Sequence, residues 1–334
     1  MKRIALYFLT LCITGAGCNL AGNSSANGFN EILQQAPYKS VSDSIEKNPA
    51  NAGLYLRRAE LLTQNNQHDI AYYDYKKSWQ LQPSETAALL YTSNLFLTGR
   101  SKDAIDLLQQ CTKQYPGNTE FTRRLGEGYT QTGDTKQALA QYDAILKTDT
   151  GNFEALYEKG MLYAQMKDTA NAVSMLEQSY RRQPILQSGL ALANLYAETK
   201  NAKVIALCDA LQQKDTARDF VDPVFLKGVY YSNIKEYAKA IPLFDEAISR
   251  DWRFVDPYVE KGIIFFEQKN YDEALKTFQY ATNISYTSAD NYYWMGRCYE
   301  AIGKKEEAID YYYKALTFDK NFSEAKEAIR RVKS

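Results

Sequence analysis

The 334-residue chain contains a single histidine, His68, and only five cysteines. One histidine cannot supply the clusters that bind transition metals, nor a set of imidazole bases for proton transfer. The glycines are scattered, so the sequence also lacks the glycine-rich loop that holds phosphate groups. These absences argue against catalysis, and we expect no enzyme activity, no metal site and no cofactor.

The chain also lacks an excess of charge of either sign, with 40 Lys and Arg against 40 Asp and Glu. Nucleic-acid binding depends on a basic face that neutralises phosphates. We therefore expect no nucleic-acid partner. Long apolar runs are missing as well: the run Ile4–Ile13 is too short to span a bilayer as a helix.

A small residue recurs along most of the chain with a period of 33 or 34 residues. The members are Ala71, Ala104, Ala138, Ala172, Ala240, Ala274 and Ala308, with one gap of two periods. Four residues after each stands a large apolar or aromatic side chain: Tyr75, Leu108, Tyr142, Leu176, Phe244, Phe278 and Tyr312. This spacing places both sets on one stripe of a helix. A period in this range predicts a helical solenoid, in which each unit buries its apolar face against its neighbours.

A second helix precedes each of these helices in the repeat. Twelve residues before five of the alanines stands a glycine: Gly126, Gly160, Gly228, Gly262 and Gly296. Glycine inside a helix costs roughly 1 kcal/mol relative to alanine, so its recurrence at one phase needs a structural reason. We expect it to allow helix A to approach the alanine-bearing face of helix B.

Together these positions resemble the tetratricopeptide repeat (TPR) family, as Tyr292, Gly296, Tyr299, Ala308 and Tyr312 illustrate for the last repeat. The resemblance covers residues 52–320. It implies an all-α fold, a right-handed α-α superhelix of about eight helix-turn-helix repeats. The fifth repeat departs from the pattern and fits only with a one-residue deletion, around Ala193, Tyr196, Val204, Cys208 and Leu211. Residues 38–51 are interpreted as an N-terminal half repeat, and residues 321–334 as a polar capping helix.

The N-terminus resembles the signal of a bacterial lipoprotein. Basic residues precede the run Ile4–Ile13, and small residues lead into Cys18. A lipobox usually has Leu three residues before the cysteine, whereas this chain has Gly15, as in the looser lipoboxes of Bacteroidetes. We interpret residues 1–18 as a signal peptide ending at a lipidated Cys18, and residues 19–37 as a flexible tether. Ordinary cleavage near Ala16 is the alternative.

The resemblance also implies where a partner would bind, because TPR proteins line a concave groove with helix A. The corresponding positions in the fourth to eighth repeats are Tyr157, Met161, Leu190, Asn194, Phe225, Val229, Val259, Ile263, Phe266, Tyr293 and Arg297. The third repeat instead places Glu120, Arg123 and Glu127 there. Only Asn194 and Arg297 could take part in a carboxylate clamp, and they are too far apart in the repeat order for one.

Three Asp-Ser/Thr-apolar triplets resemble acceptors of periplasmic O-glycosylation in Bacteroidetes. Their hydroxyl residues are Ser44, Thr169 and Thr216. The same triplets also suit helix starts or turns, and both interpretations remain open.

The sequence as a whole favours a lipid-anchored scaffold that binds a protein or peptide partner in its groove. We expect it at the bacterial outer membrane, facing the periplasm, with membrane contact only through the lipid and no small-molecule substrate. The alternative is a nutrient-uptake lipoprotein resembling the SusD family. Those proteins carry long insertions that form a sugar site, and the uninterrupted repeats leave little room for one.

The lipid anchor gives a first prediction. Changing Cys18→Ser is expected to move the protein from the membrane to the soluble fraction without changing its helix content. An alkyne fatty acid supplied to the cells is expected to label the wild type only. The matched change Cys12→Ser lies within the signal and should leave the label in place; label on the Cys18→Ser protein would contradict the assignment.

Overall fold

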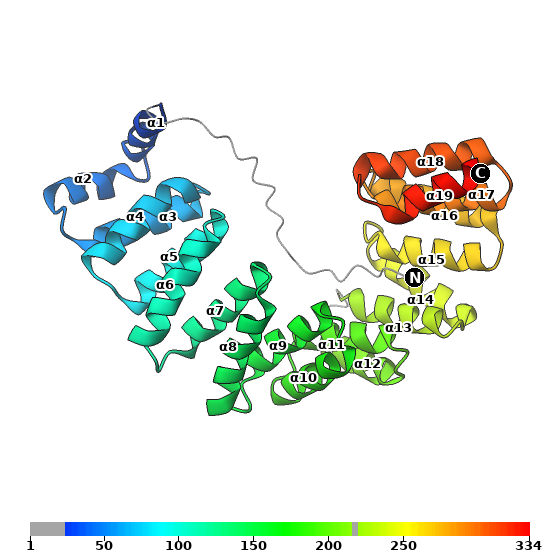
Figure 1. Cartoon of the computed structure of the whole chain (residues 1–334), viewed down its shortest axis with the longest axis horizontal. Coiled ribbons are helices and arrows are strands. Elements are labelled where there is room, and N and C mark those ends of the chain that lie inside the picture. Colours follow the sequence, from blue (N-terminus) through cyan, green and yellow to red (C-terminus); the bar gives the residue numbers. More distant parts are fainter. Residues whose placement is uncertain (1–23, 216–219) are drawn as a thin grey trace. The chain divides into compact units, whose positions relative to one another are not determined.

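The computed structural model describes residues 24–215 and 220–334. This part of the chain is all-helical, with 19 helices and no strand (Figure 1). None of these helices is both long enough and apolar enough to cross a membrane. The chain divides into two compact units between Ala138 and Leu139, inside helix α8, and each unit is considered separately.

Unit 1 contains two short helices followed by the first repeats. Its helices are α1 (Ser24–Leu33), α2 (Lys39–Lys47), α3 (Ala52–Gln64), α4 (His68–Leu81), α5 (Glu85–Leu97), α6 (Ser101–Gln114), α7 (Thr119–Gln131) and the start of α8 (Thr135–Thr148).

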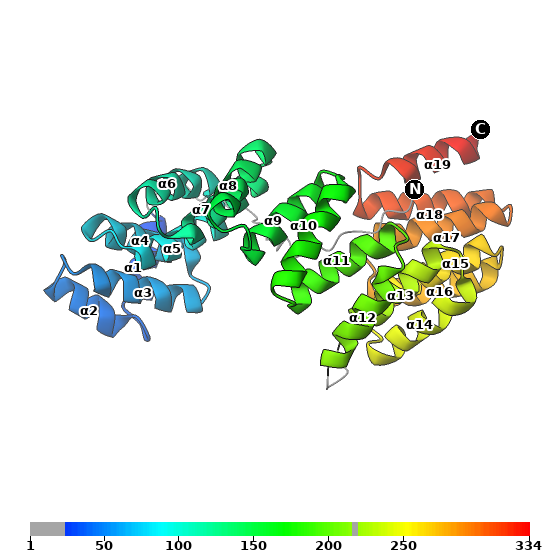
Figure 2. The same ribbon diagram turned by 90° about the horizontal axis from the view of Figure 1, so that it is seen from below.

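Unit 2 contains the remaining repeats, whose successive helices lie side by side (Figure 2). After α8 its helices are α9 (Phe153–Gln165), α10 (Thr169–Arg182), α11 (Leu186–Glu198), α12 (Lys203–Lys214), α13 (Asp222–Asn233), α14 (Tyr237–Arg250), α15 (Asp256–Glu267), α16 (Tyr271–Ile284), α17 (Ala289–Ala301), α18 (Lys305–Phe318) and α19 (Ser323–Lys333). The eight predicted repeats correspond to the eight consecutive helix pairs from α3–α4 to α17–α18.

The periodic alanines of the repeats are fully buried. All seven have an exposed fraction of 0%, and the large residues four positions later are between 0% and 2% exposed. Both sets therefore form the packed face of helix B, as the periodicity predicts.

Three of the helix-A glycines meet an aromatic ring on the alanine-bearing face of helix B, whereas Gly160 meets Leu176. A Cβ atom at Gly262 would lie 2.6 Å from Cε1 of Phe278, and one at Gly228 would lie 2.6 Å from Cε1 of Phe244. At Gly296 the nearest atoms belong to Tyr312, at 2.7 Å. These separations leave no room for a methyl group. The glycines are therefore sockets for the large side chain of helix B, four residues after the alanine.

Every turn from helix A to helix B has the same backbone form. One residue per turn has a positive φ, at Asn66, Gly99, Gly133, Lys167, Lys200, Lys235, Lys269 and Gly303. At Lys269 the amide N donates to Phe266 O, and the next amide, of Asn270, donates to Phe265 O, each at 2.9 Å. This is the Schellman arrangement, which satisfies the last carbonyls of helix A. The sequence pattern predicted the turns but not their left-handed residue.

The fifth repeat packs in the register that the sequence predicts with a one-residue deletion. The predicted positions are all buried, with exposed fractions between 0% and 4%: Ala193, Tyr196, Val204, Cys208 and Leu211. The backbone shows the shortened turn, because Val204 follows the left-handed Lys200 by four residues, whereas Ala172 follows Lys167 by five. The one-residue deletion is therefore confirmed.

The segment predicted to be a flexible tether contains a helix. Residues 1–23, including the predicted signal and Cys18, lie outside the described residues, but Ser24–Leu33 forms α1. Phe29, Ile32 and Leu33 pack against the hydrophobic cluster of unit 1. Because they are spaced by three and four residues, they share one helix face. Sequence reasoning overlooked this short apolar stripe between polar residues.

The predicted half repeat and cap are both present as helices. Arg58 of α3 forms a bidentate ion pair with Asp74 of α4, at 2.6 and 2.7 Å, and donates to Ser42 Oγ of α2 at 3.0 Å. At the other end, Ala328, Ile329 and Val332 of α19 are buried against α18. Helix α2 is therefore joined to the first repeat by a polar contact, and α19 covers an apolar face of the last repeat.

The glycine socket gives a packing prediction. Gly262→Leu forces a side chain into space held by Phe278, and overpacking of this kind costs roughly 1–3 kcal/mol. Because solenoid units are coupled mainly to their neighbours, hydrogen exchange is expected to rise most in α13–α18. Gly117→Leu is the control, since a Cβ there meets no atom within 4 Å. Equal exchange along the whole chain would contradict the socket.

The left-handed turn gives a second stability prediction. A non-glycine residue in this conformation costs about 1–2 kcal/mol, part of which is offset by the greater freedom of glycine when unfolded. Lys269→Gly is therefore expected to stabilise the protein by roughly 0.5–1 kcal/mol, measured by denaturant unfolding. Lys276→Gly, inside α16, is the opposing control and should destabilise by about 1 kcal/mol. Destabilisation by Lys269→Gly would show that the turn carries no strain.

Candidate functional site

The predicted groove residues of unit 2 come from α9, α11, α13, α15 and α17, and three of them are buried. Phe225 is 8% exposed, Val229 1% and Ile263 6%. The ring of Phe225 packs against Phe244 and Phe254, with centroids 5.9 and 5.0 Å apart. These three side chains belong to the core, so they do not line an exposed groove surface as the family positions implied. Neighbouring helices pack closely enough to cover them.

The other predicted groove residues keep part of their surface. They are Tyr157, Met161, Leu190, Asn194, Val259, Phe266, Tyr293 and Arg297. Burial raises the pKa of the Tyr157 phenol, so that hydroxyl stays protonated and can donate or accept a hydrogen bond. Nδ2 of Asn194 donates to Oε1 of Glu198 at 3.0 Å. The amide of Asn194 is thus partly engaged within its own helix.

The best-defined group on this surface is an arginine surrounded by aromatic rings. The guanidinium carbon of Arg297 lies 5.2 Å from the ring centroid of Phe266, 5.9 Å from that of Tyr293 and 5.6 Å from that of Trp294. Its Nη1 donates to the Tyr293 hydroxyl at 3.2 Å. Cations over aromatic faces are held electrostatically. We call these four residues, from α15 and α17, the Arg297 cluster.

Sequence reasoning identified three members of the Arg297 cluster and missed Trp294. The indole stacks on Phe278 with centroids 6.0 Å apart and also contacts Phe266 at 5.5 Å. It therefore joins the helix-B core to the partly exposed surface. The run of aromatics Tyr292–Trp294 could have indicated this contact. Consecutive residues on a helix point about 100° apart, so three consecutive aromatics place rings on neighbouring faces of α17.

In unit 1 the predicted groove charges neutralise one another. Nε of Arg123 lies 2.8 Å from Glu120 Oε2, and Nη1 of Arg123 pairs with Glu127. Arg124, which the sequence analysis did not select, pairs with Glu120 and donates to the carbonyl of Leu89 at 3.0 Å. Although burial alone would raise the pKa of Glu120, hydrogen bonds from the two arginines hold it below its usual value. These charges fasten α7 to α5.

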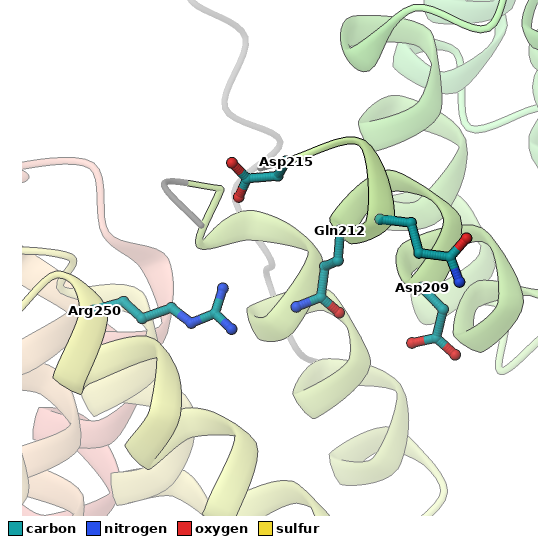
Figure 3. A pocket seen from close by; sticks show the side chains of 5 residues that line it. Asp209, Gln212, Asp215 and Arg250 are labelled. Atoms are coloured by element: carbon teal, nitrogen blue, oxygen red, sulfur yellow. The ribbon is translucent and has the colours of Figure 1, made fainter. Parts of the chain in front are cut away.

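A pocket of about 440 Å³ lies beside α12 and the end of α14 (Figure 3). Asp209, Gln212 and Asp215 line it opposite Arg250. The charged groups already have partners: Asp209 pairs with Lys227 at 2.9 Å, and Arg250 pairs with Glu246 at 2.5 Å. The pocket therefore shows no arrangement specific for a ligand.

The candidate modification sites and thiols occupy structural positions. Ser44 Oγ donates to Ser40 O at 2.8 Å within α2, and Thr169 is the first residue of α10, while Thr216 lies outside the described residues. Glycosylation remains a prediction. Burial raises the pKa of Cys111 to about 11 and that of Cys208 and Cys298 to about 12. The described residues contain no group of three potential metal ligands.

Several solved structures share this fold. A tetratricopeptide repeat protein from Parabacteroides merdae is 16% identical over 85% of this chain and 99% of its own, with a TM-score of 0.52. PilW, described as a widely conserved type IV pilus biogenesis factor, is 17% identical over 65% of this chain and 98% of its own, with a TM-score of 0.54. A chain of the APC/C hetero-tetramer Cut9-Hcn1 is 15% identical over 93% of this chain and 60% of its own, with a TM-score of 0.52.

Family models match separate parts of the chain. Three models described as tetratricopeptide repeat match residues 95–159, 153–185 and 225–291. A fourth, described as regulator of microtubule dynamics protein 1-3, matches residues 263–334. No curated protein matches the chain. Tetratricopeptide repeat models thus match residues 95–185 and 225–291, and the eight helix pairs and the shared fold agree with such repeats.

Proposed function

We propose that this protein is a lipid-anchored scaffold of the bacterial envelope that binds a partner peptide or helix and carries out no chemistry itself. The observation that carries the binding role is the Arg297 cluster. Exposed aromatic residues and arginine are the side chains that most often dominate interface energies. Here they lie together, partly exposed, on α15 and α17, and they rest on the socket rings Phe278 and Tyr312.

The geometry suits a partner with both apolar and acidic groups. Phe266, Tyr293 and Trp294 offer ring surface, while the guanidinium of Arg297 forms no salt bridge with a described residue. Planar guanidinium groups bind carboxylates through two parallel hydrogen bonds. A partner carboxylate is therefore expected to approach Arg297 from the side that the rings leave open.

The anchor and the location rest on the sequence. Small residues leading into Cys18, after a basic and then an apolar stretch, support export and lipidation. Attachment through Cys18 would restrict the scaffold to one membrane surface, where it could hold its partner near envelope machinery. We place it at the outer membrane, facing the periplasm.

The binding surface is tested by site-specific photocrosslinking in cells. A photoreactive phenylalanine analogue replaces Tyr293 in one strain and Tyr313 in the control strain. Tyr313 is an aromatic residue of α18 that is 48% exposed and lies outside the Arg297 cluster. A defined crosslinked protein is expected from position 293 only.

The crosslink should depend on the Arg297 cluster. Phe266→Ala with Arg297→Glu is expected to reduce the crosslinked product at least tenfold, because hot-spot residues each contribute about 2 kcal/mol or more. Far-UV circular dichroism checks that the double variant remains folded. Equal crosslinking from positions 293 and 313, or an undiminished product from a folded double variant, would place the partner elsewhere.

A further inference from the structure

The irregular fifth repeat carries a second surface feature. A cleft of about 510 Å³, open to solvent, lies among α10, α11 and α12. It is lined from α11 by Leu192 and Tyr196, whereas the predicted groove residues of that helix are Leu190 and Asn194. A difference of two residues corresponds to about 200° around a helix. The cleft therefore lies on the other side of α11 from the predicted groove, and is a separate surface.

Apolar side chains form the interior of the cleft. Tyr180 of α10, Leu192 of α11 and Leu207 of α12 all line it. The Tyr180 ring is fixed by Gly189, where a Cβ would lie 2.9 Å from the ring atom Cε2. Leu192 is only 3% exposed. The interior is thus a preformed apolar surface. A ring or branched side chain of a ligand could enter without a change in the conformation of these side chains.

One wall of the cleft carries a carboxylate, Glu177, whose Oε1 has two partners. Glu177 Oε1 lies 2.8 Å from Lys203 Nζ and accepts a hydrogen bond from the Tyr196 hydroxyl. These two hydrogen bonds hold the pKa of Glu177 below its usual value. Its negative charge is therefore offset by the neighbouring Lys203 ammonium.

The remaining charge at the cleft is positive. Arg181 lines the opening, is exposed and forms no salt bridge with a described residue. Lys214 Nζ lies 6.0 Å from the centroid of the Tyr180 ring and donates to the carbonyl of Pro184 at 3.3 Å. With Glu177 balanced by Lys203, these two cations give the site an excess of positive charge.

We propose that this cleft is a second docking site, which binds an acidic peptide segment of a partner protein. An aromatic side chain of the segment enters between Tyr180, Leu192 and Leu207, and a neighbouring carboxylate pairs with Arg181. Charge complementarity selects the acidic segment. The open side of the cleft lets the peptide backbone continue in both directions, as a small enclosed cavity would not.

Three synthetic peptides separate the contributions of ring and charge. They are acetyl-Ser-Glu-Phe-Asp-Ser-amide, its Lys-Phe-Lys counterpart and its Glu-Ala-Asp counterpart. Each is titrated into the chain bearing Cys18→Ser, which retains all described residues, with leucine methyl groups observed by NMR. The acidic aromatic peptide is expected to shift the methyl signals of Leu192 and Leu207, and the other two to bind at least tenfold more weakly. Leu190, on the other side of α11, should not respond.

Two neighbouring arginines provide matched variants. Arg181→Glu is expected to weaken the acidic aromatic peptide about tenfold and to strengthen the lysine peptide. Arg182→Glu makes the same charge change one residue further on, outside the cleft lining, and should leave both affinities unchanged. Equal binding of the three peptides, an unaltered affinity in Arg181→Glu, or shifts confined to Leu190 would overturn the proposal. The Arg297 cluster is untouched by these variants, so this result is independent of the crosslinking test.

Discussion

The structure depends on one steric constraint, the absence of a Cβ atom where helix A meets helix B. At Gly228, Gly262 and Gly296 the partner is an aromatic ring of the following helix, closer than any side chain would permit. The ring fills the socket and shields the zero-exposure alanine one turn earlier. These three repeats are thereby closed with little tolerance for added volume. The helix-A positions outside this contact are the ones that can vary and take on a binding role.

The sequence predicted the repeats well because their signal is steric and periodic. Ala71 to Ala308 are spaced so evenly that helix order, turn positions and buried faces follow from the period alone. The fifth repeat could be aligned as well, because its apolar residues fit the pattern once one residue is removed between Tyr196 and Val204. Helix α1 was missed because three apolar residues among polar ones are too few to establish a helical period.

The groove was predicted less well, for a reason that Ile263 illustrates. Family positions say which way a side chain points, but not how closely the neighbouring helices approach it. In unit 2 that approach buries Phe225, Val229 and Ile263 and leaves the Arg297 cluster partly exposed. Trp294 shows the opposite case: it was not predicted to line the groove, yet its large ring reaches the same surface from the neighbouring position. Solvent exposure is a property of the packed helices together, and no single repeat specifies it.

The three buried thiols have a kinetic consequence for a protein exposed to oxidants. Disulfide exchange requires a thiolate that can be reached, and Cys111, Cys208 and Cys298 are 0% exposed with raised pKa values. Each can react only when the helices covering it separate. They stand in α6, α12 and α17, and so would respond to openings in different places. The rate at which each thiol is modified therefore measures how often the surrounding helices open. Cys208 in α12 reports on opening of the fifth repeat.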